Sequence, residues 1–221
     1  MKVLVISVHP DDETLGCGGT LLKHFEKNDE LFWLILTGVS KKEGYSNAFI
    51  QDREKQILKV SQEYHFSNTI NLEYPTRKLH LVDLSDIINN IYKTIQKYKP
   101  EIVYSVNRSD IHTDHQIAAK SIISAAKSFR NSFIKRFLMY ECISETEMSP
   151  GFIENAFIPN VFTDISSFID KKIDIMKIYE SELQLSPMPR SIENIKALAK
   201  FRGATVSVDF AEAFMLIREI N

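Results

Sequence analysis

Two short polar segments hold most of the residues in this sequence that could perform chemistry. The first is His9-Pro10-Asp11-Asp12-Glu13, which follows an apolar run, and the second is "NRSDIHTDH" at residues 107–115. Adjacent carboxylates repel one another unless a cation, a proton or solvent relieves them. A divalent ion would offset the repulsion between Asp11 and Asp12, so the first segment predicts a metal site.

Imidazole nitrogens and carboxylate oxygens suit Zn²⁺, and a catalytic zinc site usually has three protein ligands and one open position. His9, Asp12 and His115 would supply such a set. Asp11 would then remain free for proton chemistry. We therefore expect one divalent ion per chain, and a site of two histidines and one aspartate also suits iron or cobalt.

The two segments lie among alternating strand and helix patterns. Strands are predicted at residues 2–8, 30–38, 69–74, 101–106 and 136–143, and helices at 18–28, 47–64, 83–98 and 114–129. This alternation predicts an α/β, Rossmann-like fold, in which a mostly parallel β-sheet carries helices on both faces. Ligands bind beyond the carboxyl ends of such strands, so both polar segments are expected to face one crevice.

The alternation changes after residue 143. Residues 144–151 indicate a loop, 157–166 an extended segment, and 166–182 and 192–202 amphipathic helices, whereas 208–220 fits either a strand or a helix. No repeat, low-complexity tract or linker divides the chain. A single domain over residues 1–221 is therefore the simplest prediction.

Composition argues against several classes of function. The formal net charge is −2 and the lysine pairs at 41–42 and 171–172 are isolated, so no nucleic-acid partner is expected. No apolar run approaches the ~20 residues that span a bilayer. "GCGG" at residues 16–19 lacks GxGxxG and stands beside acids that would repel a dinucleotide, so these glycines are expected to let a helix approach the acidic turn. Cys17 and Cys142 are expected to be reduced thiols of a cytoplasmic protein.

Six motifs resemble the PIG-L/LmbE-like zinc-dependent deacetylases, which remove acetyl groups from N-acetylglucosamine-type sugars. They are "HPDDE" at residues 9–13, "GCGGTL" at 16–21, "DREKQ" at 52–56, "DIHTDH" at 110–115, "PNVFTDIS" at 159–166 and "RGATVSVDFAEAF" at 202–214. The first and fourth are the most specific. The resemblance implies a deacetylase whose small-molecule partner is an N-acetyl amino sugar or its conjugate.

Carried over to this chain, the resemblance makes His9, Asp12 and His115 the metal ligands and Asp11 the general base. The implied reaction is metal-assisted amide hydrolysis. Zinc polarises the acetyl carbonyl and lowers the pKa of its bound water, Asp11 takes the proton, and a proton returned by Asp11 lets the amine leave.

The resemblance also assigns roles around these residues. His112 becomes the group that stabilises the oxyanion, preferably as imidazolium, and Asp110 or Asp114 is expected to orient it. Glu13 is expected to hold the turn or the following helix by hydrogen bonds instead of taking part in catalysis. Glu182 stands where relatives often have glutamine, and the sequence offers no explanation for this change.

Two arginines are candidates for substrate binding. Arg53 matches a family arginine associated with the substrate, and a surface ion pair with Glu54 or Glu63 is the alternative. In "LEYPTRKLH", Arg77 stands near the position where many relatives carry an acid, which favours an anionic sugar conjugate as substrate. An exposed ion pair between Arg77 and Glu73 is the alternative here.

The leading hypothesis is thus a cytoplasmic zinc-dependent N-deacetylase. A zinc amidase acting on a non-sugar amide, and a metal-binding protein without turnover, are the alternatives. The presence of both Asp11 and His112 argues against the last, because neither residue is needed merely to hold zinc. The sequence leaves open whether the chain forms a homo-oligomer.

Overall fold

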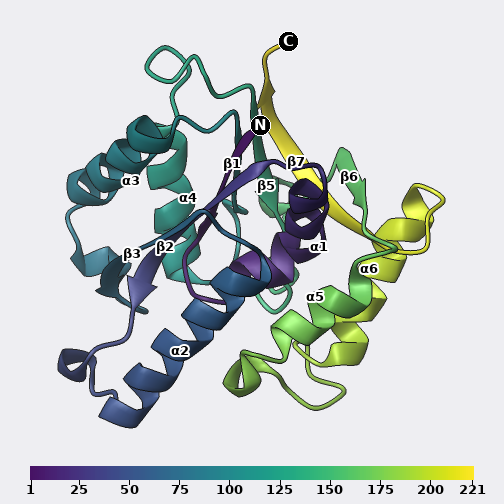
Figure 1. The fold of residues 1–221 in the computed structure, drawn as a ribbon, viewed down its shortest axis with the longest axis horizontal. Helices are drawn as coiled ribbons and strands as arrows, with labels where there is room; N and C mark the ends of the chain where they lie inside the picture. Colours follow the sequence, from purple (N-terminus) through teal and green to yellow (C-terminus); the bar gives the residue numbers. More distant parts are fainter.

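The computed structural model describes residues 1–221 and contains one seven-stranded sheet of order β3-β2-β1-β4-β5-β7-β6 (Figure 1). The strands are β1 (Lys2–Ser7), β2 (Glu30–Gly38), β3 (Asn68–Pro75), β4 (Ile102–Val106), β5 (Arg136–Tyr140), β6 (Val161–Asp164) and β7 (Ala211–Glu219). Strands β3, β2, β1, β4 and β5 pair in parallel, and β7 runs antiparallel to both β5 and β6. The expected α/β fold with a mostly parallel sheet is confirmed.

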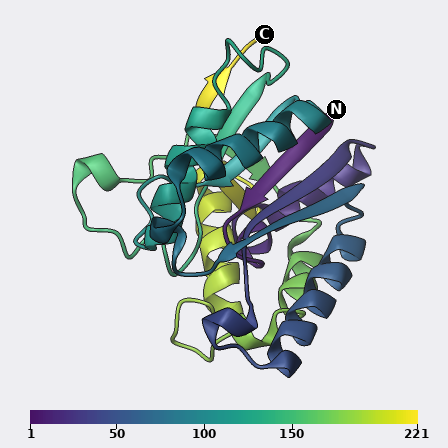
Figure 2. The same ribbon diagram turned by 90° about the vertical axis from the view of Figure 1, so that its left-hand side faces the viewer.

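Six helices cover the two faces of this sheet. They are α1 (Asp12–Glu26), α2 (Asn47–Glu63), α3 (Leu84–Tyr98), α4 (Thr113–Ala125), α5 (Ile169–Met176) and α6 (Ile192–Thr205). Helices α3 and α4 pack together on one side, while α1 and α5 pack together on the other (Figures 1 and 2). Helices α1 to α4 each connect two parallel strands, as a Rossmann-like fold requires.

Strand β1 lies where the order of the strands in the sheet reverses direction. Residues 3–8 are fully buried, as are most residues of β2, because central parallel strands are covered by helices on both faces. The chain passes from β1 to β2 on one side and later returns to β4 on the other side. The loops after β1 and β4 therefore meet at the carboxyl ends of adjacent strands, where ligands bind in such sheets.

Helix α1 begins at Asp12, before the predicted start at residue 18, and other segments also differ from the expectation or resolve an ambiguity. Helix α4 ends at Ala125 instead of Phe129, because the Asn131 side-chain amide donates hydrogen bonds to the carbonyl oxygens of Ala125 and Lys127, both at 2.9 Å. Helix α5 covers only part of residues 166–182. The N–H groups of Ile178 and Tyr179 donate to carbonyl oxygens three residues back, so the chain leaves the α-helical hydrogen-bond pattern there. The ambiguous segment 208–220 contributes strand β7, since it pairs with strands on both sides.

Two glycines of α1 allow close packing against other elements. A Cβ atom at Gly16 would lie 2.1 Å from a ring carbon of Tyr140 on β5, and one at Gly19 would lie 2.6 Å from Ile165, directly after β6. The glycines were expected to let the helix approach the acidic turn. The structure shows instead that they let α1 approach β5 and the chain beyond β6.

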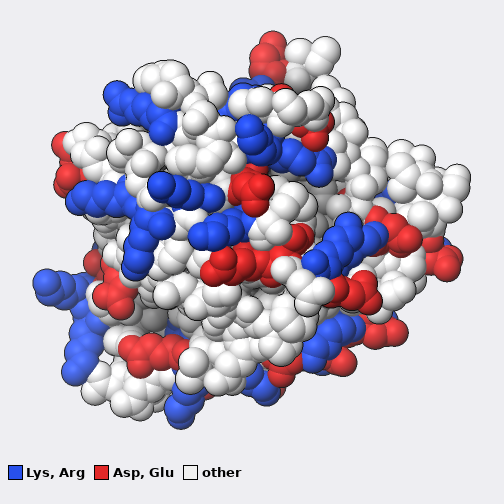
Figure 3. All heavy atoms as spheres, turned by 45° about the horizontal axis from the view of Figure 1, so that its top comes forward, with Lys and Arg blue, Asp and Glu red and all other residues white.

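Charged residues of both signs are spread over the face of the molecule shown in Figure 3. On this face (Figure 3), basic and acidic side chains are interspersed, so no uninterrupted field of one sign covers it. No helix combines the length and the apolar character needed to cross a membrane.

Candidate active site

The turn after β1 presents His9 and Asp11 at the carboxyl end of the strand. Asp11 has a φ of 143°, which residues with a side chain rarely adopt, and it forms the N-cap of α1. Its N–H donates to Glu13 Oε2 (3.1 Å), and the Glu13 carboxylate also accepts from the hydroxyls of Thr14 (2.7 Å) and Tyr179 (3.0 Å). These bonds hold the turn, as expected for Glu13.

His112 lies in the loop after β4 and forms the N-cap of α4. Its Nδ1 accepts a hydrogen bond from the Asp114 N–H (3.1 Å), so a neutral ring carries its proton on Nε2. Burial and the nearby rings of His9 and His115 lower the pKa of His112 to about 4. The structure therefore favours a neutral His112 as hydrogen-bond donor, contrary to the imidazolium expected from the sequence.

His9, Asp12 and His115 bring three candidate metal-ligand atoms together. His115 Nε2 lies 3.4 Å from His9 Nδ1 and 3.4 Å from Asp12 Oδ1, and one ligand atom of each residue lies within 4.8 Å of the others. A tetrahedral zinc ion with bonds of about 2.1 Å requires ligand atoms about 3.4 Å apart. The donor set and its spacing therefore fit such a divalent ion.

Hydrogen bonds hold the other polar atoms of this group. His115 Nδ1 lies 2.8 Å from Asp110 Oδ2, and Asp12 Oδ2 accepts from the backbone N–H groups of Val8 (2.9 Å) and His9 (2.8 Å). Outside this group, Asp12 Oδ1 accepts a hydrogen bond only from the weak thiol donor of Cys142 (3.4 Å), so Asp12 Oδ1 and His115 Nε2 are the atoms available to a ligand. Burial opposes ionisation of Asp12, but the charges of His115 and His9 and their hydrogen bonds outweigh it and hold the pKa of Asp12 below its usual range.

The Asp114 carboxylate supports a neighbouring loop and does not hydrogen-bond to His112. It accepts from two backbone N–H groups of residues 77–79, at 2.6 and 3.0 Å, and its Oδ2 lies 3.4 Å from His9 Nε2. The Asp110 carboxylate is paired with His115. Neither carboxylate hydrogen-bonds to the His112 ring, so the expected orientation of His112 by a carboxylate is not found. The backbone N–H of Asp114 orients that ring instead.

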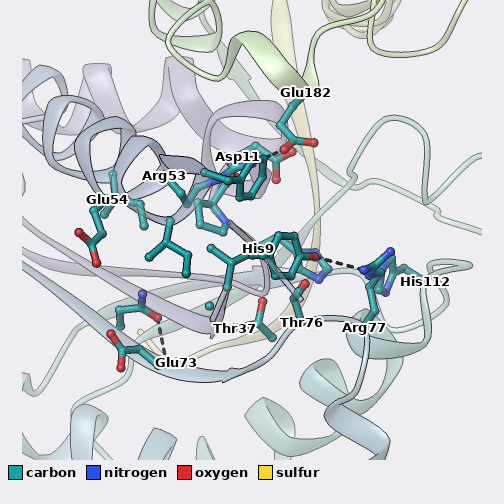
Figure 4. A pocket seen from close by; sticks show the side chains of 18 of the residues that line it. His9, Asp11, Thr37, Arg53, Glu54, Glu73, Thr76, Arg77, His112 and Glu182 are labelled. Atoms are coloured by element: carbon teal, nitrogen blue, oxygen red, sulfur yellow. Dashed lines mark hydrogen bonds and ion pairs between the residues drawn. The ribbon is translucent and has the colours of Figure 1, made fainter. Parts of the chain in front are cut away.

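A pocket of about 270 Å³ opens at this end of the sheet, close to the lower end of the ~300–1,000 Å³ typical of small-molecule sites (Figure 4). His9, Asp11 and His112 all line it. Asp11 is only 2% exposed, and its Oδ1 is buried without a hydrogen-bond partner. Burial raises the pKa of Asp11 well above its usual range, and the charge of Arg190 opposes that shift. One carboxyl oxygen of this pocket residue is therefore buried and unengaged.

Arg53 reaches the same turn from α2. Its Nη1 donates to the carbonyl oxygen of Pro10 (3.2 Å), and its Nη2 forms an ion pair with Glu182. Figure 4 shows Arg53 beside Asp11 and turned toward Glu182. The surface ion pair with Glu54 or Glu63 expected as an alternative is wrong, because the side chain points inward and is buried.

Arg77 lies beside His112, on the opposite side of the pocket from Glu54 and Glu73 (Figure 4). Its guanidinium donates one hydrogen bond, from Nη2 to the Tyr45 hydroxyl (3.2 Å), and no carboxylate lies within ion-pair distance. The expected alternative of an Arg77–Glu73 ion pair is therefore wrong. Arg77 adds an uncompensated positive charge to the pocket.

More than half of the chain matches a known protein family. Residues 4–126 match the PIG-L family, described as GlcNAc-PI de-N-acetylase. The chain belongs to the PIG-L family. The matched region contains both polar segments and four of the five parallel strands.

Two PIG-L relatives extend the match over most of the chain. Diacetylchitobiose deacetylase from Thermococcus kodakarensis is 24% identical over 98% of this chain and 83% of its own length. Probable N-acetyl-alpha-D-glucosaminyl L-malate deacetylase 2 from Bacillus anthracis is 20% identical over 95% of this chain and 91% of its own. Both relatives are named as deacetylases of compounds that contain N-acetylglucosamine.

Solved structures show how widely the PIG-L fold is used. The conserved protein TT1542 from Thermus thermophilus has a TM-score of 0.78 and 25% identity, covering 99% of this chain and 96% of that one. GalB, the 4-carboxy-2-hydroxymuconate hydratase from Pseudomonas putida KT2440, has a TM-score of 0.74 and 18% identity, covering 100% and 97%. Because a hydratase shares the fold, the fold alone does not establish deacetylation.

Arg190 is a residue of this PIG-L pocket that the sequence analysis missed. Its Nη1 lies 2.9 Å from Asp11 Oδ2 and 3.3 Å from Glu182 Oε2, and its Nη2 lies 3.3 Å from Glu145 Oε1. Arg190 follows α5 and stands 179 residues from Asp11, so no local spacing could pair them. The one available signal was Glu182, an acid whose purpose was unexplained and which lies between two arginines.

Proposed function

We propose that this PIG-L protein is a zinc-dependent N-deacetylase that releases acetate from an N-acetylated amino sugar of the N-acetylglucosamine type. The observation that carries the proposal is the placing of His115 Nε2 at 3.4 Å from both His9 Nδ1 and Asp12 Oδ1, in a site that also contains the unengaged Oδ1 of Asp11. The activities named for the relatives support this choice of reaction. An ion held by His9, Asp12 and His115 would supply a Lewis acid that polarises a carbonyl and acidifies water.

Two residues are proposed as catalytic. Asp11 Oδ1 accepts a proton from the attacking water, whose oxygen adds to the acetyl carbon, and the proton then passes to the nitrogen as the C–N bond breaks. His112 Nε2–H donates to the acetyl oxygen while that oxygen carries negative charge. The Asp114 N–H holds the other nitrogen of His112, so the ring keeps its donor available. Acetate and the free amine are the products.

Two carboxylates are proposed to support the metal ligands. Asp110 would orient His115, and Asp114 would orient His9, because each lies within reach of the nitrogen that faces away from the group. Such outer carboxylates set the tautomer and the orientation of metal-bound histidines.

Arg53 and Arg77, the two arginines that the sequence suggested for substrate binding, receive different roles. The Nη atoms of Arg53 are engaged by Pro10 and Glu182, so we assign Arg53 mainly to support of the turn beneath the substrate. Arg77 has free donors beside His112 and is the better candidate for recognising an anionic substituent. The substrate proposed is therefore an N-acetyl amino sugar with a phosphate or carboxylate group at the Arg77 side.

We also propose a cytoplasmic location, which the two cysteines support. Cys17 and Cys142 are free, buried thiols, which suits the cytoplasm, where thiols stay reduced.

A zinc amidase for a non-sugar amide is the alternative enzyme. A metal-binding protein without turnover is the alternative outside catalysis.

Acetate release separates these possibilities. Zinc-loaded protein is incubated with neutral and phosphorylated N-acetylglucosamine, diacetylchitobiose and simple non-sugar acetamides, and acetate is measured. We expect turnover on at least one N-acetyl sugar, its loss on chelation and its return with added zinc. Turnover on non-sugar acetamides alone would favour the amidase, and no turnover with zinc bound would favour the binding protein.

A further inference from the structure

We infer that Arg190 is a positioning residue which, joined to Arg53 through Glu182, holds the carboxylate of Asp11 so that Oδ1 is the oxygen that accepts the proton. The inference rests on the proposed function, in which Asp11 is the general base. It assigns a purpose to Arg190 and to Glu182, which neither the motifs nor the family relationship explained.

The two arginines hold Asp11 through two different groups. Arg53 Nη1 donates to the carbonyl oxygen of Pro10 (3.2 Å), the residue just before Asp11, and thus holds the backbone. Arg190 Nη1 donates to Asp11 Oδ2 (2.9 Å) and thus holds the side chain. Glu182 joins them, because its Oε1 pairs with Arg53 and its Oε2 lies 3.3 Å from Arg190 Nη1.

Asp11 needs such support because its own conformation is unfavourable. Its backbone has a φ of 143°, and a residue in such a region keeps its place only when the surroundings impose it. A carboxylate can also turn about its Cβ–Cγ bond and exchange its two oxygens. Arg190 occupies Oδ2, whereas Oδ1 is buried and has no partner. The oxygen left for the proton of the attacking water is therefore Oδ1.

The remaining contacts of Arg190 make it a fixed anchor. Its Nε donates to the Ser144 hydroxyl (2.8 Å), its Nη2 pairs with Glu145 (3.3 Å), and its side chain is 18% exposed. Each nitrogen of the guanidinium is thus engaged by protein atoms. These contacts favour a role in holding Asp11 over a direct contact with substrate.

Glutamate at position 182 is required by this arrangement. Two arginines approach its two oxygens, and both ion pairs need the full carboxylate. Glutamine would offer one oxygen, and its NH₂ group would face a guanidinium that has only donors. One of the two arginines would then lose its partner.

The test measures the kcat and KM for acetate release by Arg190→Met, Arg190→Lys, Glu182→Gln and a matched control, Arg202→Met. Arg202 is suitable because its side chain is also 18% exposed and pairs with a carboxylate, Glu141 (2.6 Å), but does not line the pocket. Arg190→Met should lower kcat about 10- to 100-fold, the cost of a misplaced catalytic group, with KM within about 3-fold. Arg190→Lys should recover part of the kcat, Glu182→Gln should lower it, and Arg202→Met should keep it.

Crystal structures of Arg190→Met and Arg190→Lys supply a second readout that does not depend on turnover. The Asp11 carboxylate should rotate or lose its order in the methionine variant and return to its place in the lysine variant. An unmoved carboxylate, a kcat of Arg190→Met within 2-fold of the wild type, or an equal loss in Arg202→Met would overturn the inference. If zinc-loaded wild type releases no acetate, the proposed function fails, and the crystal structures still decide whether Arg190 positions Asp11.

Discussion

His115 Nδ1 lies 2.8 Å from Asp110 Oδ2, and both side chains are almost completely buried. The other oxygen of Asp110 accepts from the Thr146 hydroxyl (2.7 Å), so the carboxylate itself has a fixed orientation. The imidazole consequently points its Nε2 toward His9 and Asp12. The orientation of one proposed ligand is thus built into the protein before any ion binds.

Removing that carboxylate should weaken metal binding without removing a ligand. Asp110→Asn should lower zinc affinity about 10- to 100-fold, because the amide no longer holds the ring in the same tautomer and orientation. Competition with a chromophoric chelator measures the affinity. Asp29→Asn is the control, since Asp29 pairs with His24 Nδ1 (2.7 Å) in the same way outside the pocket. Equal zinc affinities of wild type and Asp110→Asn would show that Asp110 does not support the ligand.

His115→Ala tests the ligand set directly. The wild type should bind one zinc ion per chain, and this variant should lose stoichiometric zinc at concentrations that saturate the wild type, because two ligands remain of three. Elemental analysis of the dialysed protein measures the occupancy. A fully occupied His115→Ala protein would place the ion elsewhere.

Asp11→Asn should separate binding from chemistry. The amide is nearly the same size as the carboxylate but cannot accept the proton of water, so kcat should fall about 10²- to 10⁴-fold, roughly 3–5 kcal/mol of barrier. Zinc content should stay at the wild-type level, because Asp11 is not among the three proposed ligands. Acetate release and elemental analysis on the same sample check both statements. A kcat near the wild-type value would remove Asp11 from the mechanism.

His112 has a structural and a proposed catalytic role, which two substitutions should separate. Its Nδ1 caps α4, so His112→Ala should lower the free energy of unfolding by about 0.5–2 kcal/mol, whereas His112→Ser should restore a cap. Both variants lack the Nε2–H donor and should lose about 10²- to 10³-fold in kcat. Denaturant unfolding and acetate release are the measurements. Recovery of kcat in His112→Ser would mean that only the cap matters.

Arg77→Ala tests the charge of the substrate. It should raise KM for a phosphorylated or carboxylated N-acetyl sugar roughly 10- to 150-fold, or about 1.5–3 kcal/mol, while sparing neutral N-acetylglucosamine. Lys78→Ala is the control, because Lys78 is a neighbouring exposed cation that pairs with Glu43 outside the pocket. Equal losses on charged and neutral sugars would indicate that Arg77 packs the loop, and no loss on either would place Arg77 outside the site.

Much of this protein follows from local sequence patterns. The apolar runs and the helical periods predicted the strands of the parallel sheet and the helices between them, and residues 30–38 match β2 at both ends. The turn at residues 9–13 and the loop at 107–115 were recognisable because polar residues directly follow buried strands. Since parallel strands place their carboxyl ends at one edge, the meeting of His9 and His115 was also predictable.

Tertiary structure alone decided how the site is completed. Arg53 and Arg190 reach Glu182 and Asp11 from different elements, and the partners are separated by as many as 179 residues. The Asp110 carboxylate turns toward His115, and the Asp114 carboxylate turns toward His9. Neither reaches His112, whose Nδ1 already accepts a hydrogen bond from a backbone N–H. Residue types and periods are local properties of the chain. The partner of a long charged side chain depends on which elements the fold packs beside it, and no spacing in the sequence records that choice.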